Sequence, residues 1–127
     1  MLSIPSSVRI YLAAEPTDMR KGFDCLAALV NARGLDVYSG HLFVFISKRR
    51  NRAKVLAWER GGFVLFYKRL ERGRFKLPSP LDDNVRLDAV QLTMLLDGVD
   101  LAKVRRTRAW QPPRPNDTTG IDTRSRL

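Results

Sequence analysis

The order of hydrophobic and polar residues predicts a strand and then a helix in the first third of the chain. Residues 8–14 (VRIYLAA) are apolar and partly β-branched, and Pro16 follows them, so this stretch predicts a strand that ends before the proline. Thr17 suits the cap of a helix over residues 18–32, which Gly34 then ends. The apolar residues of this helix recur at the spacing of one helical face, namely Met19, Phe23, Leu26, Ala27 and Val30.

The middle of the chain has the pattern of four short strands, at 42–46, 54–59, 63–70 and 75–77. Gly61 and Gly62 lie between the second and the third of them. This pair is typical of a two-residue hairpin, because both glycines accept a positive φ. Gly73 suits a left-handed turn before the last strand. Short connections of this kind join antiparallel neighbours, so the sequence predicts an antiparallel β-meander.

The last third predicts a proline-broken link, a second helix and a tail. The link covers residues 77–84 (LPSPLDDN), and Asp88 then begins a helix that Gly98 stops or kinks. Residues 107–127 contain prolines, small polar residues and few large apolar ones, so we expect a flexible basic tail that adds only charge. The side of the second helix that we expect to be buried carries Val90, Met94, Leu95 and Leu101.

These elements predict one α+β domain over residues 1–106. It would contain an antiparallel β-meander of four to five strands, with one helix before the meander and one after it. A chain of 127 residues is long enough for one modest hydrophobic core and too short for two.

Net charge separates this chain from an ordinary small domain. It has 23 Lys and Arg against 13 Asp and Glu, a formal net charge of +10. A polyanion is therefore the first partner to consider, and an anionic membrane surface is the second. No apolar run approaches the roughly 20 residues that span a bilayer, and the first residues lack the pattern of a signal peptide. We expect a cytoplasmic protein that does not enter a membrane.

The basic residues are concentrated in three stretches, at 48–60, at 68–76 and from 103 to the end. Alternate turns of a meander lie at the same end of its sheet, so the tip at 47–53 and the turn at 71–74 should form one positive surface. Arginine outnumbers lysine there, which favours bidentate contacts with phosphate or guanine. The alternative is that these cations only discourage pairing between sheet edges. The expected nucleic-acid-binding residues of this surface are Lys48, Arg49, Arg50, Arg52, Lys54, Arg72 and Arg74.

A second candidate anion site lies at the start of the first helix. Arg20 and Lys21 fall in its expected first turn, where free backbone N–H groups and two cations would suit an anion. Gly22, inside that helix, suggests a close approach by another backbone. The alternative is that Asp18 offsets the cations and that Gly22 packs against a strand.

The aromatic residues of the expected strands have two interpretations. Core packing beneath the helices explains them with fewer assumptions than stacking on single-stranded nucleic acid. Trp58 and Tyr67 are the two that we expect to be partly exposed. Apolar residues on both faces of the sheet are also compatible with a protein partner that covers one face. The residues concerned are Phe43, Phe45, Trp58, Phe63, Phe66 and Tyr67.

The sequence contains no recognisable catalytic or metal-binding pattern. The acidic residues are scattered, and Asp82 and Asp83 lie in a proline-flanked loop that suits a turn better than a metal-ligand pair. The one histidine, His41, suits a hydrogen-bonding role at the start of a strand. The one cysteine, Cys25, suits the core. We therefore expect no enzyme activity, no metal and no cofactor.

Five collinear motifs resemble one protein family: PTDMRKGFD with LAALV (16–30), SGHLFVF (39–45), RRNR (49–52), GGFVLFYKRLERGRFKLP (61–78) and QLTMLLDGVD (91–100). They resemble the accessory protein TnpB, or second-orf protein, of the insertion sequence 66 family, over about residues 8–105. The resemblance implies a bacterial mobile-element protein, encoded beside a separate transposase and needed for efficient transposition. It supplies no catalytic residues. Cys25 stands where the family pattern has glycine, and the chain after about residue 106 does not follow that pattern.

The residues and the resemblance together favour a non-catalytic accessory protein of a bacterial insertion sequence that supports DNA transposition. Its expected partners are DNA, at the ends of the element, and the transposase of the same element, with the basic hairpin on the phosphates. One alternative is a protein-interaction module that binds the transposase without contacting DNA. Another is an uncharacterised nuclease or a regulator of the element's expression.

Overall fold

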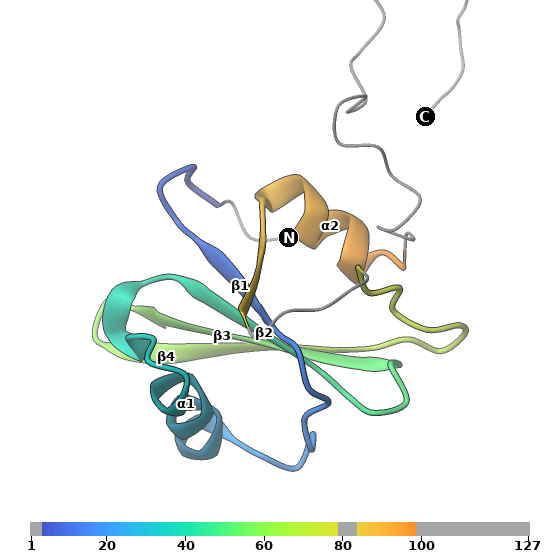
Figure 1. Ribbon diagram of the computed structural model, residues 1–127, viewed down its shortest axis with the longest axis horizontal. Helices are drawn as coiled ribbons and strands as arrows, with labels where there is room; N and C mark the ends of the chain where they lie inside the picture. The colour runs from blue at the N-terminus through green and yellow to red at the C-terminus, as the bar shows by residue number, and fades with distance from the viewer. Residues whose placement is uncertain (1–3, 79–83, 99–127) are drawn as a thin grey trace, which may run out of the picture.

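The computed structural model describes residues 4–78 and 84–98, which form a five-stranded sheet between two helices (Figure 1). The predicted tail over 107–127 lies outside the described residues, as do Asp82, Asp83 and Leu101. The elements follow one another as β1 (Ile10–Ala13), α1 (Phe23–Ala32), the 3-10 turn η1 (Val37–Ser39), β2 (Leu42–Ile46), β3 (Arg52–Glu59), β4 (Gly62–Arg69), β5 (Asn84–Leu87) and α2 (Ala89–Leu96).

The sheet is mixed, with the strand order β4-β3-β2-β1-β5. The antiparallel meander is confirmed for β2, β3 and β4, and the α+β class holds, with α1 before the meander and α2 after it. However, β1 pairs in parallel with β2, with Ile10 opposite Leu42, so the prediction of a purely antiparallel sheet is wrong. The physical reason is that the chain crosses from β1 to β2 through α1, and such a crossover returns it in the same direction.

Two details of the predicted strands also differ. Residues 75–77 are not a strand; Phe75 lies in a loop with a fully buried side chain. The fifth strand is β5, which pairs antiparallel with β1 and begins at the end of the segment predicted as a link. The β3–β4 hairpin turns through Arg60 and Gly61, one residue earlier than predicted, and both have a positive φ (50° and 85°).

The two faces of the sheet explain why residues 42–46 form an unbroken apolar run. Successive strand side chains point to opposite faces, and a helix covers each face (Figure 1). All five residues of β2 are therefore buried. On one face Leu42, Val44 and Ile46 share a core cluster with Leu92, Leu95 and Leu96 of α2. On the other face Phe43 and Phe45 share a cluster with Leu26 and Val30 of α1.

Helix α1 begins later than the sequence predicts, at Phe23 instead of residue 18. Gly22 is its N-cap and has open space where a Cβ would stand, so neither a close backbone approach nor strand packing explains this glycine. Thr17 is not the cap; it is buried, and its N–H donates to the carbonyl of Ile46 (2.9 Å). Cys25 is exposed, so its expected place in the core is wrong.

Helix α2 begins where the sequence predicts, and Asp88 is its N-cap. The Asp88 carboxylate accepts the Gln91 N–H (2.7 Å), and the Gln91 side-chain oxygen accepts the Asp88 N–H (2.9 Å), which completes a capping box. Gly98, with φ 83°, follows the end of the helix as predicted. Val90 is exposed, so its expected burial is wrong. A different face of α2 packs against the sheet. The buried residues are Leu92, Leu95 and Leu96.

His41 has the predicted hydrogen-bonding role. Its Nδ1 accepts the backbone N–H of Arg9 (2.9 Å), and the carbonyl of Arg9 accepts the N–H of Leu42 (2.9 Å), so this pair joins the starts of β1 and β2. Burial lowers the pKa of His41 below its usual 6.5; the charges of Arg9 and Arg86 lower it further, against a smaller opposing effect of Asp36.

Acidification below about pH 6.5 should therefore lower the thermal midpoint of the protein. The folded state holds His41 with a lowered pKa, so the unfolded state binds its proton more tightly. The stability that this group contributes is complete above the unfolded pKa of about 6.5 and is lost as the pH falls below it. His41→Asn is the control, because its amide oxygen can still accept a hydrogen bond but does not titrate. Melting curves recorded from about pH 7.5 to about pH 5.5, roughly one unit to either side of that pKa, should show a smaller loss of thermal midpoint for this variant than for the unmodified protein. Equal losses in both proteins would contradict the assignment to His41.

Candidate nucleic-acid interface

Two basic loops meet at one end of the sheet, as the meander predicts. The first is the β2–β3 tip at 47–51, and the second is the loop at 70–76 that follows β4. The Leu70 N–H donates to the carbonyl of Asn51 (2.8 Å), and the Phe75 N–H donates to the carbonyl of Arg50 (2.6 Å). The two loops lie together on the right of Figure 1. Because Phe75 is also fully buried, the second loop is fixed to both the tip and the core.

The tip is closed by hydrogen bonds around Ser47. Its N–H donates to the carbonyl of Arg52 (2.9 Å), and its hydroxyl oxygen accepts the N–H of Arg52 (3.1 Å). The N–H of Arg50 donates to the carbonyl of Ser47 (2.9 Å), and Arg50 takes the left-handed conformation with φ 61°. This tight turn leaves Lys48, Arg49 and Arg50 exposed at its apex.

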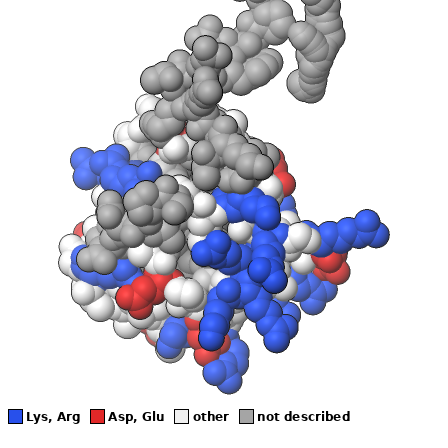
Figure 2. Space-filling view, turned by 45° about the vertical axis from the view of Figure 1, so that its right-hand side comes forward, with Lys and Arg blue, Asp and Glu red and all other residues white. Residues whose placement is uncertain are grey.

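We use the term basic end for the surface formed by Lys48, Arg49, Arg50, Arg52, Arg72 and Arg74. Five of these side chains are exposed and Arg52 is partly buried. Within residues 4–78 and 84–98, none of the six forms an ion pair with a carboxylate. Figure 2 brings this side of the molecule forward and shows Lys and Arg side chains gathered over it, with few acidic side chains among them. The basic end thus carries charge that its described surroundings do not neutralise.

An open groove of about 770 Å³ separates the tip from the segment before α1. Its walls include Thr17, Arg20, Lys48 and Arg49. Arg20 forms a forked contact with Asp18, with Nη2 2.7 Å from the carboxylate oxygen. The hydrogen bonds from the Arg20 side chain and backbone lower the pKa of Asp18 to about 2. The pair is therefore ionised and nearly neutral in sum.

Arg20 and Lys21 precede α1. Their predicted position in the first turn of that helix, on which the anion site was based, is therefore wrong. The structure brings Arg20 to the groove beside the tip, whereas Lys21 does not line it. The contribution of the segment before α1 is therefore one guanidinium that is already paired with Asp18.

Lys54 differs from the other predicted cations because it is only 7 % exposed. Its ammonium donates to the carbonyls of Met19 and Lys21, both at 2.8 Å, and lies 4.8 Å from the ring centre of Tyr67. Lys54 thus holds the segment before α1 on the sheet, and its charge faces the interior. We leave it out of the basic end for this reason.

Lys54→Met should lower the free energy of unfolding by about 2–3 kcal/mol, since it removes two charge-assisted hydrogen bonds and leaves two carbonyls without a donor. Urea unfolding monitored by circular dichroism measures the loss. Lys76→Met is a matched control, because Lys76 is exposed and its loss should change stability by less than about 0.5 kcal/mol. Similar values for the two variants would show that Lys54 does not hold that segment.

Sequence reasoning missed Arg69 and the contacts of Tyr67. Arg52 lies opposite Arg69 and Lys54 lies opposite Tyr67 in the β3–β4 pairing, so all four side chains share one face of the sheet. A hollow of about 360 Å³ is lined by Arg52, Tyr67, Arg69 and Glu71. The signal in the sequence was the period-2 spacing of residues 67 and 69, which could be used only once the register with β3 was known.

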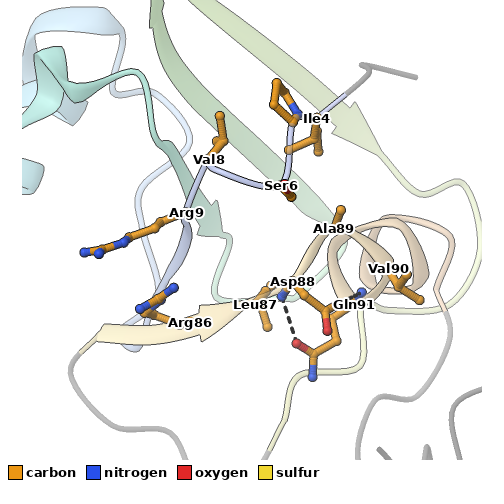
Figure 3. Close-up of a pocket in the computed structure, with 11 residues that line it drawn as sticks. Ile4, Ser6, Val8, Arg9, Arg86, Leu87, Asp88, Ala89, Val90 and Gln91 are labelled. Carbon is orange, nitrogen blue, oxygen red and sulfur yellow. Dashed lines mark hydrogen bonds between the residues drawn. The ribbon is translucent and has the colours of Figure 1, made fainter.

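A further groove lies at the opposite end of β2, between residues 4–9 and the start of α2 (Figure 3). Its volume is about 730 Å³, and Arg9 and Arg86 lie together on one side of it. The side chains of Asp88 and Gln91 in its wall form the helix cap. In the part of the chain that the structure describes, no three His, Cys, Asp or Glu side chains are grouped to hold a metal ion. No described helix has the length and apolar character to cross a membrane.

Comparisons with known proteins identify the family. The family described as IS66 Orf2 like protein matches residues 8–106. Two proteins of Sinorhizobium fredii are similar along nearly their whole length: Uncharacterized protein y4jC, 34 % identical over 88 % of this chain and 97 % of its own, and Uncharacterized protein y4hO, 38 % identical over 88 % and 96 %. No solved structure matches. The chain therefore belongs to the IS66 Orf2-like family of insertion-sequence accessory proteins.

Proposed function

We propose that this protein supports transposition of its insertion sequence as a non-catalytic factor that binds duplex DNA through the basic end. The observation that carries the proposal is the set of exposed cations from two separate loops that lie at one end of the sheet without carboxylate partners among the described residues. Such charges bind phosphates with release of counterions. Because the hydrogen bonds of Leu70 and Phe75 fix one loop to the other, little conformational entropy is lost on binding.

The transposase is the second proposed partner, and an aromatic patch supports this proposal. Tyr38 is 59 % exposed and its ring packs against Trp58 (4.9 Å between ring centres) and Phe63 (5.7 Å). Phe23, also exposed, stacks on Phe63 (6.4 Å). Exposed aromatic clusters are typical of protein interfaces. Trp58 and Phe63 flank the β3–β4 turn, at the end of these strands opposite the basic end, so both partners could be bound together.

A mobility-shift titration of the purified chain on a terminal-repeat duplex and on a scrambled duplex tests the DNA proposal. The logarithm of the association constant should fall linearly with the logarithm of salt concentration, by about 0.9 for each phosphate contact. Tighter binding of the terminal-repeat duplex than of the scrambled duplex would identify the ends of the element as the preferred binding site. If neither duplex binds at low salt, the DNA proposal fails, and the protein-interaction module remains.

A further inference from the structure

Tyr67 is a half-exposed aromatic ring that is held in one position beside the basic end. It lies on β4, which is an edge strand, and is 49 % exposed. The Lys54 ammonium lies over the ring, 4.8 Å from its centre, and is itself fixed by two backbone carbonyls. The Arg52 guanidinium donates to the Tyr67 hydroxyl (3.4 Å). The ring therefore presents a fixed apolar surface to solvent.

The hollow beside this ring has a different electrostatic character from the basic end. Arg69 donates through Nε to the Glu71 carboxylate (3.0 Å), and its Nη2 lies 3.0 Å from the same oxygen. Since Glu71 offsets the charge of Arg69, the hollow is less suited to a phosphate than the basic end is. It combines an aromatic face with guanidinium donors and a carboxylate acceptor. A nucleobase has the matching features, namely a stacking face and an edge with donors and acceptors.

We propose that Tyr67, with Arg52, Arg69 and Glu71, binds an unpaired base of a DNA strand whose neighbouring phosphates lie on the basic end. Arg52 belongs to the basic end and also lines this hollow, so one strand can pass from phosphate contacts to base stacking. In duplex DNA the faces of a base are stacked and its edge is paired, so only single-stranded or frayed DNA presents such a base. The inference rests on the proposed function and extends it to unpaired strands.

The test compares two single strands of about 12 nucleotides, a length within the range of one single-strand binding site. One is oligothymidylate, and the other is an abasic strand with the same phosphates and no bases. Fluorescence anisotropy at fixed salt should show about tenfold tighter binding of the oligothymidylate. Tyr67→Leu should remove this preference, and Tyr67→Phe, which keeps the ring, should retain it. Tyr38→Leu is the matched control, because it removes an exposed aromatic ring outside the hollow and should leave the preference unchanged.

Each other result has a definite meaning. Equal affinity of the unmodified protein for the two strands would overturn the base subsite, whatever the folding of the variants. A preference that persists in Tyr67→Leu would also overturn it. An oligouridylate that binds more than about tenfold tighter than oligothymidylate would reassign the subsite to RNA, because only the 2′-hydroxyl and the base methyl differ. If no strand and no duplex binds, the proposed function fails together with this inference, whereas duplex binding without base preference overturns the inference alone.

Discussion

Alanine at Arg49, Arg72 and Arg74 together should weaken binding to duplex DNA by roughly two to three orders of magnitude at about 0.1 M salt. Each cation that neutralises a phosphate contributes about 0.9 to the slope of log K against log salt, so three lost contacts should flatten the slope by about 2.7. The three side chains are exposed, and the thermal midpoint should stay nearly unchanged. Titrations at a series of salt concentrations measure both quantities.

A matched pair of double variants separates the basic end from the overall charge. Arg72→Ala/Arg74→Ala and Arg9→Ala/Arg86→Ala each remove two exposed arginines, the second pair at the opposite end of β2. Only the first pair should flatten the salt dependence by about two contacts. Equal losses of affinity in the two double variants would show that net charge, and not the basic end, attracts the DNA. Unchanged affinity in both would favour the protein-interaction module.

Phe75→Ala should lower the free energy of unfolding by about 3–5 kcal/mol, the range typical of truncating a fully buried phenylalanine. The Phe75 side chain is fully buried and belongs to the core cluster on the α2 face, although its backbone lies in a loop. Removing the ring leaves a cavity and releases the loop that carries Arg72 and Arg74 from the core. Urea unfolding with linear extrapolation measures the loss.

Phe23→Ala is the control for Phe75→Ala, since Phe23 is 44 % exposed and its truncation should cost less than about half as much. Phe75→Leu, which keeps most of the apolar volume, should recover a large part of the stability. A loss below about 1 kcal/mol for Phe75→Ala would contradict its role as the anchor of the second basic loop.

The elements that the sequence predicted well are those whose own residues carry the signal. The apolar run at 42–46 indicates a strand, and Asp88 before an apolar helical pattern indicates a helix start; the structure has both. The parallel pairing of β1 was not predicted, because it depends on the path of the chain through α1 and not on residues 10–13. β5 has only four residues and borders the segment predicted as a proline-broken link, so its short polar–apolar alternation (NVRL) did not stand out as a strand.

The candidate site was likewise predicted only in part. The shared end of the two basic loops followed from the alternation of hairpin turns, but the roles of individual cations did not. Arg52 and Lys54 are two residues apart on one face of β3, yet Lys54 lies beneath the segment at 19–21 and Arg52 does not. Nothing in the composition of residues 47–54 (SKRRNRAK) distinguishes them. Phe75 and Leu77 have the period of a strand, and only the structure shows that the first of them anchors a loop.

The interior position of β1, between β2 and β5, has a consequence for synthesis and for engineering of this protein. Ile10–Ala13 leaves the ribosome before its two neighbours in the sheet, β2 and β5, and the second of them lies near the end of the described chain. The meander of β2, β3 and β4 can form from local contacts before β1 is paired on both sides. The pairing of β5 with β1 and the packing of α2 on the sheet then form last. An N-terminal truncation that passes Ile10 would therefore remove a strand from the interior of the sheet and leave β5 without the strand that it pairs with.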